Sequence, residues 1–372
     1  MKLLTFELKK VFFSKKFIYL LLLIIIGIGA LFLRNITFQE YIEKEELREI
    51  ESQITTAQGK SRIHGIEVEK DPEDEKAELL KDITTSLLIS LYDLRAANPG
   101  DDWRAKLTLQ NQALLDTVNY KEAGGDHPFS FKEIEHRLAM NEKLLADDIK
   151  PEHPMYSLAL PNFMKHIVDL YITLGAIIIL VLLIGEILSG EYENHSINLL
   201  FTQPLKKTQI IMSKFWSSVI VYLFTTGIIL GAITLIGFVF GEKGAFNYPI
   251  LIEKNNQIAF ITISDFLTEG LLVLMVTIVM VIALYLLFSL LFKHTLLTLF
   301  VLLGALVGGY VVTSFITWPT FAWINPFQYL LPEKTILVQN GSEWYQGIPV
   351  ILLLTVVFYI MASLKIKTSK ID

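Results

Sequence analysis

The chain has 372 residues, of which 52% are hydrophobic and 19% are charged, and it contains no cysteine. The missing cysteine excludes disulfide-stapled domains and thiolate metal or redox sites. A net charge of −6 gives no support to nucleic-acid binding. Charge is concentrated in one region, because 43 of the 70 acidic and basic residues lie between Arg34 and Lys165. The rest is too apolar for a soluble core, and the sequence predicts a membrane protein with one polar domain inserted.

The first predicted element is an amphipathic helix within residues 1–16. Its apolar residues, among them Leu4, Leu8 and Phe12, recur at helical spacing, and its lysines lie towards another face. Such a helix lies in the membrane interface with its lysines towards anionic headgroups. The alternative is a basic segment that only orients the first span, which is predicted at 17–33.

Residues 34–165 are predicted to form a helical outer domain with a net charge of −9. A cap at Asp71-Pro72 is predicted to open a helix that ends before Asn98-Pro99-Gly100. A further helix is expected at 102–120. Ser130 and Glu133 form a capping box that opens another helix, ending near Ala146.

The outer domain also contains His127, His136 and His153 among its acidic residues. Their spacing matches no metal-ligand motif, so a solvated acidic surface is favoured over a metal site. The acidic charge would attract cationic peptides or drugs through its long-range field, although acidic surfaces are common.

Six segments are apolar and long enough for helices that cross about 30 Å of hydrocarbon. They are 17–33, 170–188, 215–240, 267–292, 295–316 and 345–364. The predicted fold is therefore an all-α membrane protein. It has an N-terminal interfacial helix, six transmembrane helices, and the helical extracytoplasmic domain 34–165 between spans one and two. Region 166–372 holds spans two to six.

Orientation follows from the lysines near the span ends, because cytoplasmic loops are rich in basic residues. Twelve lysines share one side: Lys2, Lys9, Lys10, Lys15, Lys16, Lys206, Lys207, Lys214, Lys293, Lys365, Lys367 and Lys370. The opposite side has three, so both termini are predicted to be cytoplasmic. Four aromatic residues near the outer ends of spans five and six fit an interfacial belt: Trp318, Trp323, Trp344 and Tyr345.

Two kinds of residue stand out within the spans. Gly227-x-x-x-Gly231 and Gly304-x-x-x-Gly308 allow helices to approach closely, and we favour packing inside one subunit over a dimer seam. Glu186 is a candidate intramembrane polar residue, able to bond to the following loop or to line an inner vestibule.

Loop 189–214 follows the second predicted span. It begins with Glu191 and Glu193, continues into a short amphipathic helix that includes Leu199, and turns at Pro204. Basic residues then lead into the third span. A helix of this kind either docks a cytoplasmic partner or rests on lipid, and the residues alone leave both interpretations open.

The loop resembles the first cytoplasmic loop of type-2 ATP-binding cassette (ABC) exporter permeases, such as bacterial multidrug and bacteriocin-type export permeases. The matching positions are Glu191, Glu193, Leu199, Leu200, Pro204, Lys207 and Lys214. His195-Ser196 stands where Gly-Thr is common, and Lys207 replaces the usual arginine. The order of spans and the segment Asn325–Tyr329 before the last span also resemble that family.

The resemblance implies a non-enzymatic permease subunit of an ABC exporter that forms the translocation pathway in a bacterial cell membrane. It implies a second permease chain, identical or related, and cytoplasmic ATPase subunits that bind ATP and Mg. Lipid is a further partner, and this chain is expected to bind no cofactor, metal or nucleic acid. It has no G-x-x-x-x-G-K-[ST] P-loop and no H-E-x-x-H. The implied ATPase-coupling residues are Glu191, Glu193, His195, Ser196, Leu199, Leu200, Pro204, Lys207 and Lys214. The alternative is a peptide-immunity or sensing protein that sequesters a ligand through its outer domain without transport.

Overall fold

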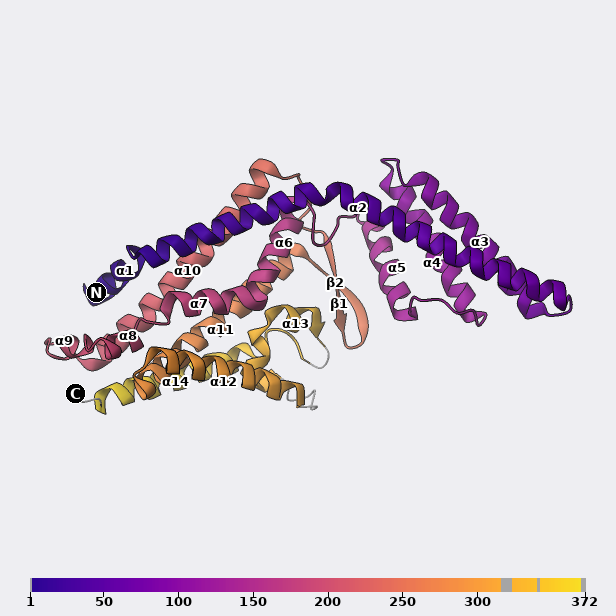
Figure 1. The fold of residues 1–372 in the computed structure, drawn as a ribbon. Coiled ribbons are helices and arrows are strands. Elements are labelled where there is room, and N and C mark those ends of the chain that lie inside the picture. The colour runs from indigo at the N-terminus through magenta and orange to yellow at the C-terminus, as the bar shows by residue number, and fades with distance from the viewer. Residues whose placement is uncertain (1, 316–322, 340–341, 369–372) are drawn as a thin grey trace. The chain divides into compact units, whose positions relative to one another are not determined.

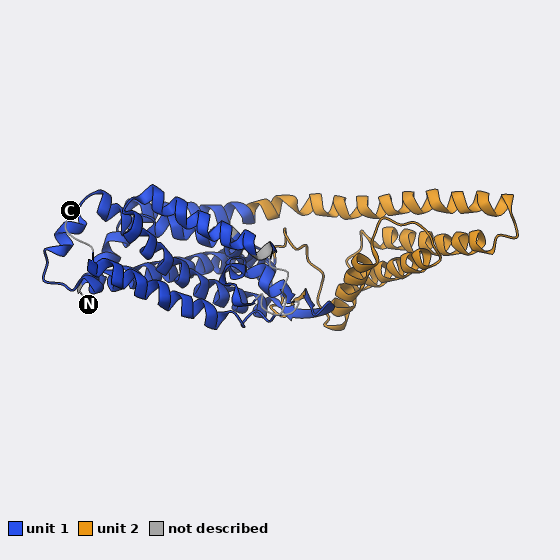
Figure 2. Ribbon diagram, turned by 90° about the horizontal axis from the view of Figure 1, so that it is seen from below, with its two compact units in different colours: residues 1–32, 159–244, 252–372 blue, residues 33–158, 245–251 orange. Residues whose placement is uncertain are grey.

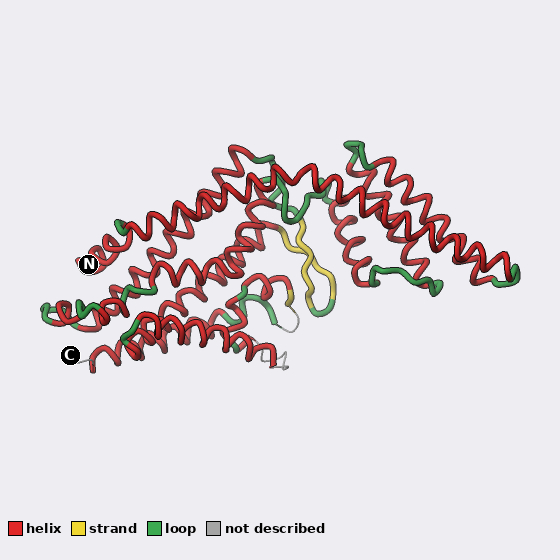
Figure 3. Tube along the Cα trace, in the orientation of Figure 1, coloured by secondary structure: helices red, strands yellow, loops and turns green. Residues whose placement is uncertain are grey.

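A computed structural model describes residues 2–315, 323–339 and 342–368. The chain is built mainly of helices (Figures 1 and 3) and divides into two compact units (Figure 2). Unit 1 comprises Met1–Phe32, Ala159–Gly244 and Ile252–Asp372, and unit 2 comprises Leu33–Leu158 and Ala245–Leu251. Three positions named in the sequence predictions, Ile316, Trp318 and Lys370, lie outside the described residues.

Unit 1 contains most of the apolar helices. Helix α2 (Lys15–Lys70) begins in unit 1 and continues without a break into unit 2. The other elements of unit 1 are α1 (Lys2–Phe12), α6 (Leu160–Leu170), the π-helical turn η1 (Tyr171–Gly175), α7 (Ala176–Ile184), α8 (Ser189–Glu193), α9 (Ile197–Phe201), α10 (Lys207–Phe240), α11 (Ile263–Phe292), α12 (Thr295–Phe315), the 3-10 turn η3 (Pro326–Leu330), α13 (Pro332–Leu337) and α14 (Ile348–Thr368).

Five helices in the described part of the chain, namely α2, α10, α11, α12 and α14, are long and apolar enough to span a membrane. The segment predicted as the span 170–188 is instead a pair of helices bent by 57° around the π-helical turn, and it makes a sixth span if the pair crosses as one. A π turn inserts an extra residue into the helical hydrogen-bond ladder, which bends the axis. Periodicity within an apolar run does not reveal such a bend.

Helix α11 lies at the centre of unit 1. Two-thirds of its most apolar stretch is buried, against 17–39% in the other four candidate spans. Val273 and Met280 of α11 pack with Tyr329 of η3 and Ile351 of α14. The helices around α11 therefore share one apolar core.

A three-stranded sheet is an addition that the sequence analysis did not predict. Strands β1 (Pro249–Lys254) and β2 (Gln257–Thr262) are neighbours, and β1 also pairs in parallel with β3 (Val338–Gln339). Asn255 and Asn256 join β1 to β2 with φ values of 51° and 61°. Two consecutive left-handed residues form the tight turn that suits a two-residue hairpin, and asparagine tolerates this conformation.

Unit 2 is a bundle formed by the second part of α2 with α3 (Glu75–Ala97), α4 (Trp103–Glu122) and α5 (Phe131–Ala146). Asp102 caps α4 and Ser130 caps α5, which confirms both predicted starts. The predicted start at Asp71-Pro72 is wrong. Asp74 is the N-cap of α3, accepting from the amides of residues 76 and 77, whereas Asp71 and Pro72 form the turn after α2.

The segment Ala245–Leu251 also belongs to unit 2, although the sequence analysis did not assign it there. Ala245 and Tyr248 pack against a cluster that includes Leu107 and Leu144. The Glu152 amide donates a hydrogen bond of 3.2 Å to the Tyr248 hydroxyl. These contacts hold a segment far along the chain against the bundle.

Two of the three histidines considered above accept hydrogen bonds from backbone amides. His127 Nδ1 accepts from Phe129, and His153 Nδ1 accepts from Met155 and Tyr156. Burial lowers the pKa of both imidazoles, so both rings stay neutral acceptors near neutral pH. Among the residues that the structure describes, no group of three or more acidic or histidine side chains is placed to hold a metal ion.

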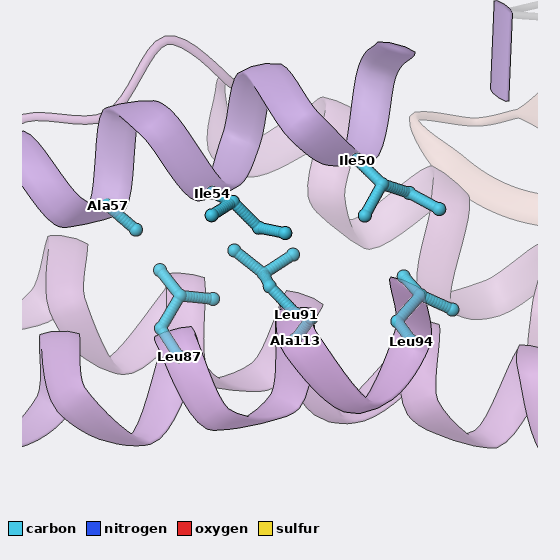
Figure 4. Close-up of a cluster of buried hydrophobic side chains, with 7 residues drawn as sticks. All are labelled: Ile50, Ile54, Ala57, Leu87, Leu91, Leu94 and Ala113. Carbon is cyan, nitrogen blue, oxygen red and sulfur yellow. The ribbon is translucent and has the colours of Figure 1, made fainter. Parts of the chain in front are cut away.

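We expect unit 2 to be most sensitive to mutation in its apolar core. Figure 4 shows Leu91, whose exposed fraction is 1%, surrounded by residues of α2, α3 and α4. Leu91→Ala should lower the free energy of unfolding by about 2–5 kcal/mol, because it leaves a cavity. Leu79→Ala on the exposed side of the same helix should change it by less than about 0.5 kcal/mol. Hydrogen exchange of α3 and α4 in the full chain measures both, and equal effects would contradict this packing.

Candidate functional site around loop 189–214

Loop 189–214 folds into two short helices between the end of α7 and the start of α10. Helix α8 ends at Glu193, and His195 takes a left-handed conformation with φ of 52° before α9 begins at Ile197. After α9, the chain turns through Pro204 and enters α10 at Lys207. All nine predicted coupling residues lie within this compact arrangement.

Lys214 is the buried centre of the loop's contacts. Its side chain has no exposed surface, and its Nζ lies 3.1 Å from Glu7 Oε1 and 2.8 Å from Glu191 Oε2. It also donates a hydrogen bond of 2.9 Å to the backbone carbonyl of Ile187. Removing an ammonium group from water is costly unless opposite charges and acceptors surround it, and this site supplies both.

Lys10 completes the network. Its Nζ lies 2.9 Å from Glu191 Oε1, so Glu191 bridges a buried lysine and a half-exposed one. Two carboxylates and two ammonium groups therefore balance one another. Glu7 and Lys10 belong to α1, Glu191 to α8 and Lys214 to α10, so four charges connect three helices.

Glu7 is a site residue that the sequence analysis missed. The predicted interfacial helix α1 packs against α10, and only 2% of the Glu7 side chain is exposed. The available signal was an acidic residue among apolar and basic ones in residues 2–12. Its partner is 207 positions away in the chain, so no local pattern could identify it.

Glu193 performs a separate task at the start of α12. Its carboxylate accepts hydrogen bonds from the Thr295 amide at 3.0 Å and from the Thr295 hydroxyl at 2.6 Å. His294 Nε2 lies 3.3 Å from the same side chain. The first amides of a helix lack intrahelical acceptors, and a carboxylate there satisfies one and favours the helix dipole. Helix α8 is thus joined to α12 as well.

The exposed surface of the loop is mostly polar, and Leu199 is a large apolar residue within it. Leu199 on α9 is 71% exposed. Beside it, a hollow of about 590 Å³ separates α9 from α1. It is lined by Leu3, Phe6, Lys10, Glu191, Ser196, Leu199, Leu200, Gln203, Pro204 and Leu205. The acidic pair of the motif therefore contacts its own chain, whereas Leu199 is exposed beside the hollow.

The remaining predicted coupling residues lie around the Lys214 charge network. Ser196 Oγ donates to the Glu191 carbonyl at 3.4 Å, and the Lys207 ammonium lies over the Phe201 ring. His195 lines a second hollow, of about 470 Å³, with Lys293 and other residues. Each of these side chains supports or borders α8 and α9.

Glu186 lies in the segment that joins α7 to α8. Its side chain is 67% exposed, and it pairs with Lys16 at 2.9 Å at the start of α2. Glu186 is therefore a largely exposed partner of Lys16, whereas Glu191 pairs with Lys10 and Lys214.

The four predicted packing glycines do not form close contacts in the described chain. A Cβ added at Gly227, Gly231, Gly304 or Gly308 would meet no atom within 4 Å other than its own helix backbone. All four lie on exposed helix faces. This differs from the packing inside one subunit that the sequence favoured, because spacing defines a small-residue face without specifying what covers it.

Comparison with known proteins agrees with this arrangement. The family described as "ABC-2 family transporter protein" matches residues 1–362. The chain belongs to the ABC-2 transporter family. Membership confirms the resemblance stated above. It identifies a multi-pass membrane permease of an ABC transporter, and it implies association with ABC ATPases in general. No curated protein and no solved structure matches the chain.

The buried network in this ABC-2 permease makes a testable prediction. Lys214→Met leaves Glu7 buried and unpaired, and should lower the free energy of unfolding by about 3–5 kcal/mol. Adding Glu7→Gln should restore most of the lost free energy of unfolding. The double variant has no unpaired buried charge, because the remaining carboxylate, Glu191, still pairs with Lys10. Lys16→Met, which breaks the exposed pair with Glu186, should cost less than about 1 kcal/mol. Unfolding of the purified full chain measures all three, and a double variant no better than the single one would refute the charge argument.

Substitution of Glu193 should change amide hydrogen exchange at the start of α12. Glu193→Ala should speed amide hydrogen exchange at residues 295–298 several-fold, because the N-terminal amide loses its acceptor. Glu193→Gln retains an oxygen acceptor and should have a smaller effect. Exchange in the rest of α12 serves as the internal control. Unchanged exchange at 295–298 in the alanine variant would show that this cap contributes nothing.

Proposed function

We propose that this ABC-2 protein is the permease subunit of an exporter. In this proposal it forms the translocation pathway with a second permease chain, identical or related, and separate cytoplasmic ATPase subunits bind ATP and Mg. The lysine distribution supports cytoplasmic termini and an extracytoplasmic location for residues 34–165 in a bacterial cell membrane. The chain itself is not the ATP-hydrolysing enzyme, which agrees with its lack of a P-loop motif.

The observation that carries the proposal is the double connection of α8. Glu191 ties α8 to α1 and α10 through Lys214, and Glu193 ties it to the first residue of α12. Both connections are short and charged. A force applied to α9 would therefore reach α10 and α12 together, because packed elements with few soft contacts move as a unit.

Leu199 on α9 and the apolar residues beside it supply the proposed docking surface. Leu199 is largely exposed, and Leu200 and Pro204 line the adjacent hollow. Apolar side chains that enter a partner's pocket dominate the affinity of most interfaces. We infer that α9 binds a groove of the ATPase, and that movement of the ATPase subunits reorients the spans through α8.

Substitution of Leu199 tests the docking surface. Leu199→Glu should weaken binding of the copurifying Walker-motif ATPase at least tenfold, since a charge cannot be buried in an apolar pocket without a partner. Phe13→Glu is the matched control, because Phe13 is 79% exposed and lies outside the loop. Titration of the ATPase against the permease in lipid nanodiscs measures both. Equal affinities for Leu199→Glu and wild type would sink the docking assignment.

The second candidate function is a peptide-immunity or sensing protein that retains a ligand without moving it. A cavity in unit 2, described below, supplies the ligand site that this alternative requires. Reconstitution of the permease with its ATPase separates the two functions. Vectorial transport with substrate-stimulated ATP hydrolysis supports the exporter, and ligand binding without either supports sequestration.

A further inference from the structure

Unit 2 contains a cavity of about 760 Å³, within the size range of small-ligand sites. Residues of all four bundle helices and of the chain after α5 line it, including Ile50, Leu94, Ala113 and Met140 on the apolar side. Ile50, Leu94 and Ala113 also belong to the buried apolar core of the bundle (Figure 4), so one side of the cavity is formed by packed apolar side chains.

Several polar side chains of the lining have no hydrogen-bond partner among the described residues. The side chains of Glu46, Gln53, Asn98 and His136 line the cavity and form no hydrogen bond or ion pair with any described residue. Asn141 differs, because its amide donates 2.9 Å to Asn111. The cavity therefore offers two primary amides, an imidazole and a carboxylate that remain available to a ligand.

The charge balance of the cavity is negative. Glu49 is neutralised by Arg137, whose Nη1 lies 2.8 Å from Glu49 Oε1. Arg137 also contacts Glu133 at 3.3 Å, so its charge is already shared by two carboxylates. Glu46 forms no ion pair with a lining residue, and Lys106 outside the lining is the basic residue whose charge acts on it. Residues 34–165 around it carry a net charge of −9, which adds a field of the same sign.

We propose that this cavity binds a short peptide segment that carries a basic side chain. The basic group would pair with Glu46, while Gln53 and Asn98 would bond to peptide C=O and N–H groups, since a primary amide both donates and accepts. Apolar side chains of the segment would pack on Ile50, Leu94 and Ala113. The proposal does not rest on the exporter assignment, because such a site serves transport and retention equally.

Binding to the full chain in zwitterionic lipid nanodiscs, without any ATPase, tests the site. The probe is a fluorescein-labelled, C-terminally amidated hexapeptide of alternating leucine and lysine. It should bind saturably, above the signal of empty nanodiscs, and a leucine–glutamate hexapeptide should not. Glu46→Gln should weaken binding about tenfold, the size expected for losing a charge-assisted hydrogen bond.

Glu135→Gln is the matched control, because it removes the same charge from an exposed position on α5 outside the cavity lining. It should change the affinity by less than about twofold, as the long-range field alone contributes little at physiological salt. Gln53→Trp, which fills the cavity, should abolish binding while hydrogen exchange of α3 and α4 stays as in wild type. Equal weakening by Glu46→Gln and Glu135→Gln, or absence of saturable binding, would overturn the proposal without affecting the ATPase-docking experiment.

Discussion

A lysine without solvent exposure holds three helices of this permease in one arrangement. Lys214 sits at the start of an apolar helix, and its charge is tolerated only while Glu7, Glu191 and the Ile187 carbonyl remain in place. Helices α1, α8 and α10 must therefore keep one relative position. This explains why the short helix α1 packs against the apolar helix α10. Helix α1 supplies Glu7, one of the two carboxylates that pair with Lys214.

The same constraint gives the two glutamates of the loop different partners. Glu191 and Glu193 are two residues apart on α8, yet one is drawn into the Lys214 network and the other caps α12. With its acidic pair in contact with the chain itself, the loop exposes Leu199. The proposed ATPase docking therefore rests on Leu199 and on the charged contacts that hold α8 in place.

Unit 2 combines a highly charged surface with an apolar interior. Its helices meet through a compact set of aliphatic residues around Leu91, and most ion pairs on its surface are exposed and individually weak. Arg137 satisfies Glu49 and Glu133, and Glu46 forms no ion pair with a residue that lines the cavity. The excess acidity noticed in the composition thus has at least one defined position where a ligand could use it.

The sequence by itself determined the helical membrane class, the approximate extents of the apolar helices, the helix start near Asp102 and the cap at Ser130, because these depend on composition and on neighbours within one helical turn. It also identified the loop and its family. Only the tertiary structure decided that Asp74 rather than Asp71 starts α3, that the second apolar segment bends at a π turn, and that a small sheet forms. It alone assigned the partners of Glu7, Glu191 and Glu193. Except for Glu191–Lys214, the hydrogen-bonded contacts join residues 102 to 207 positions apart, and local pattern carries no information about pairs so distant.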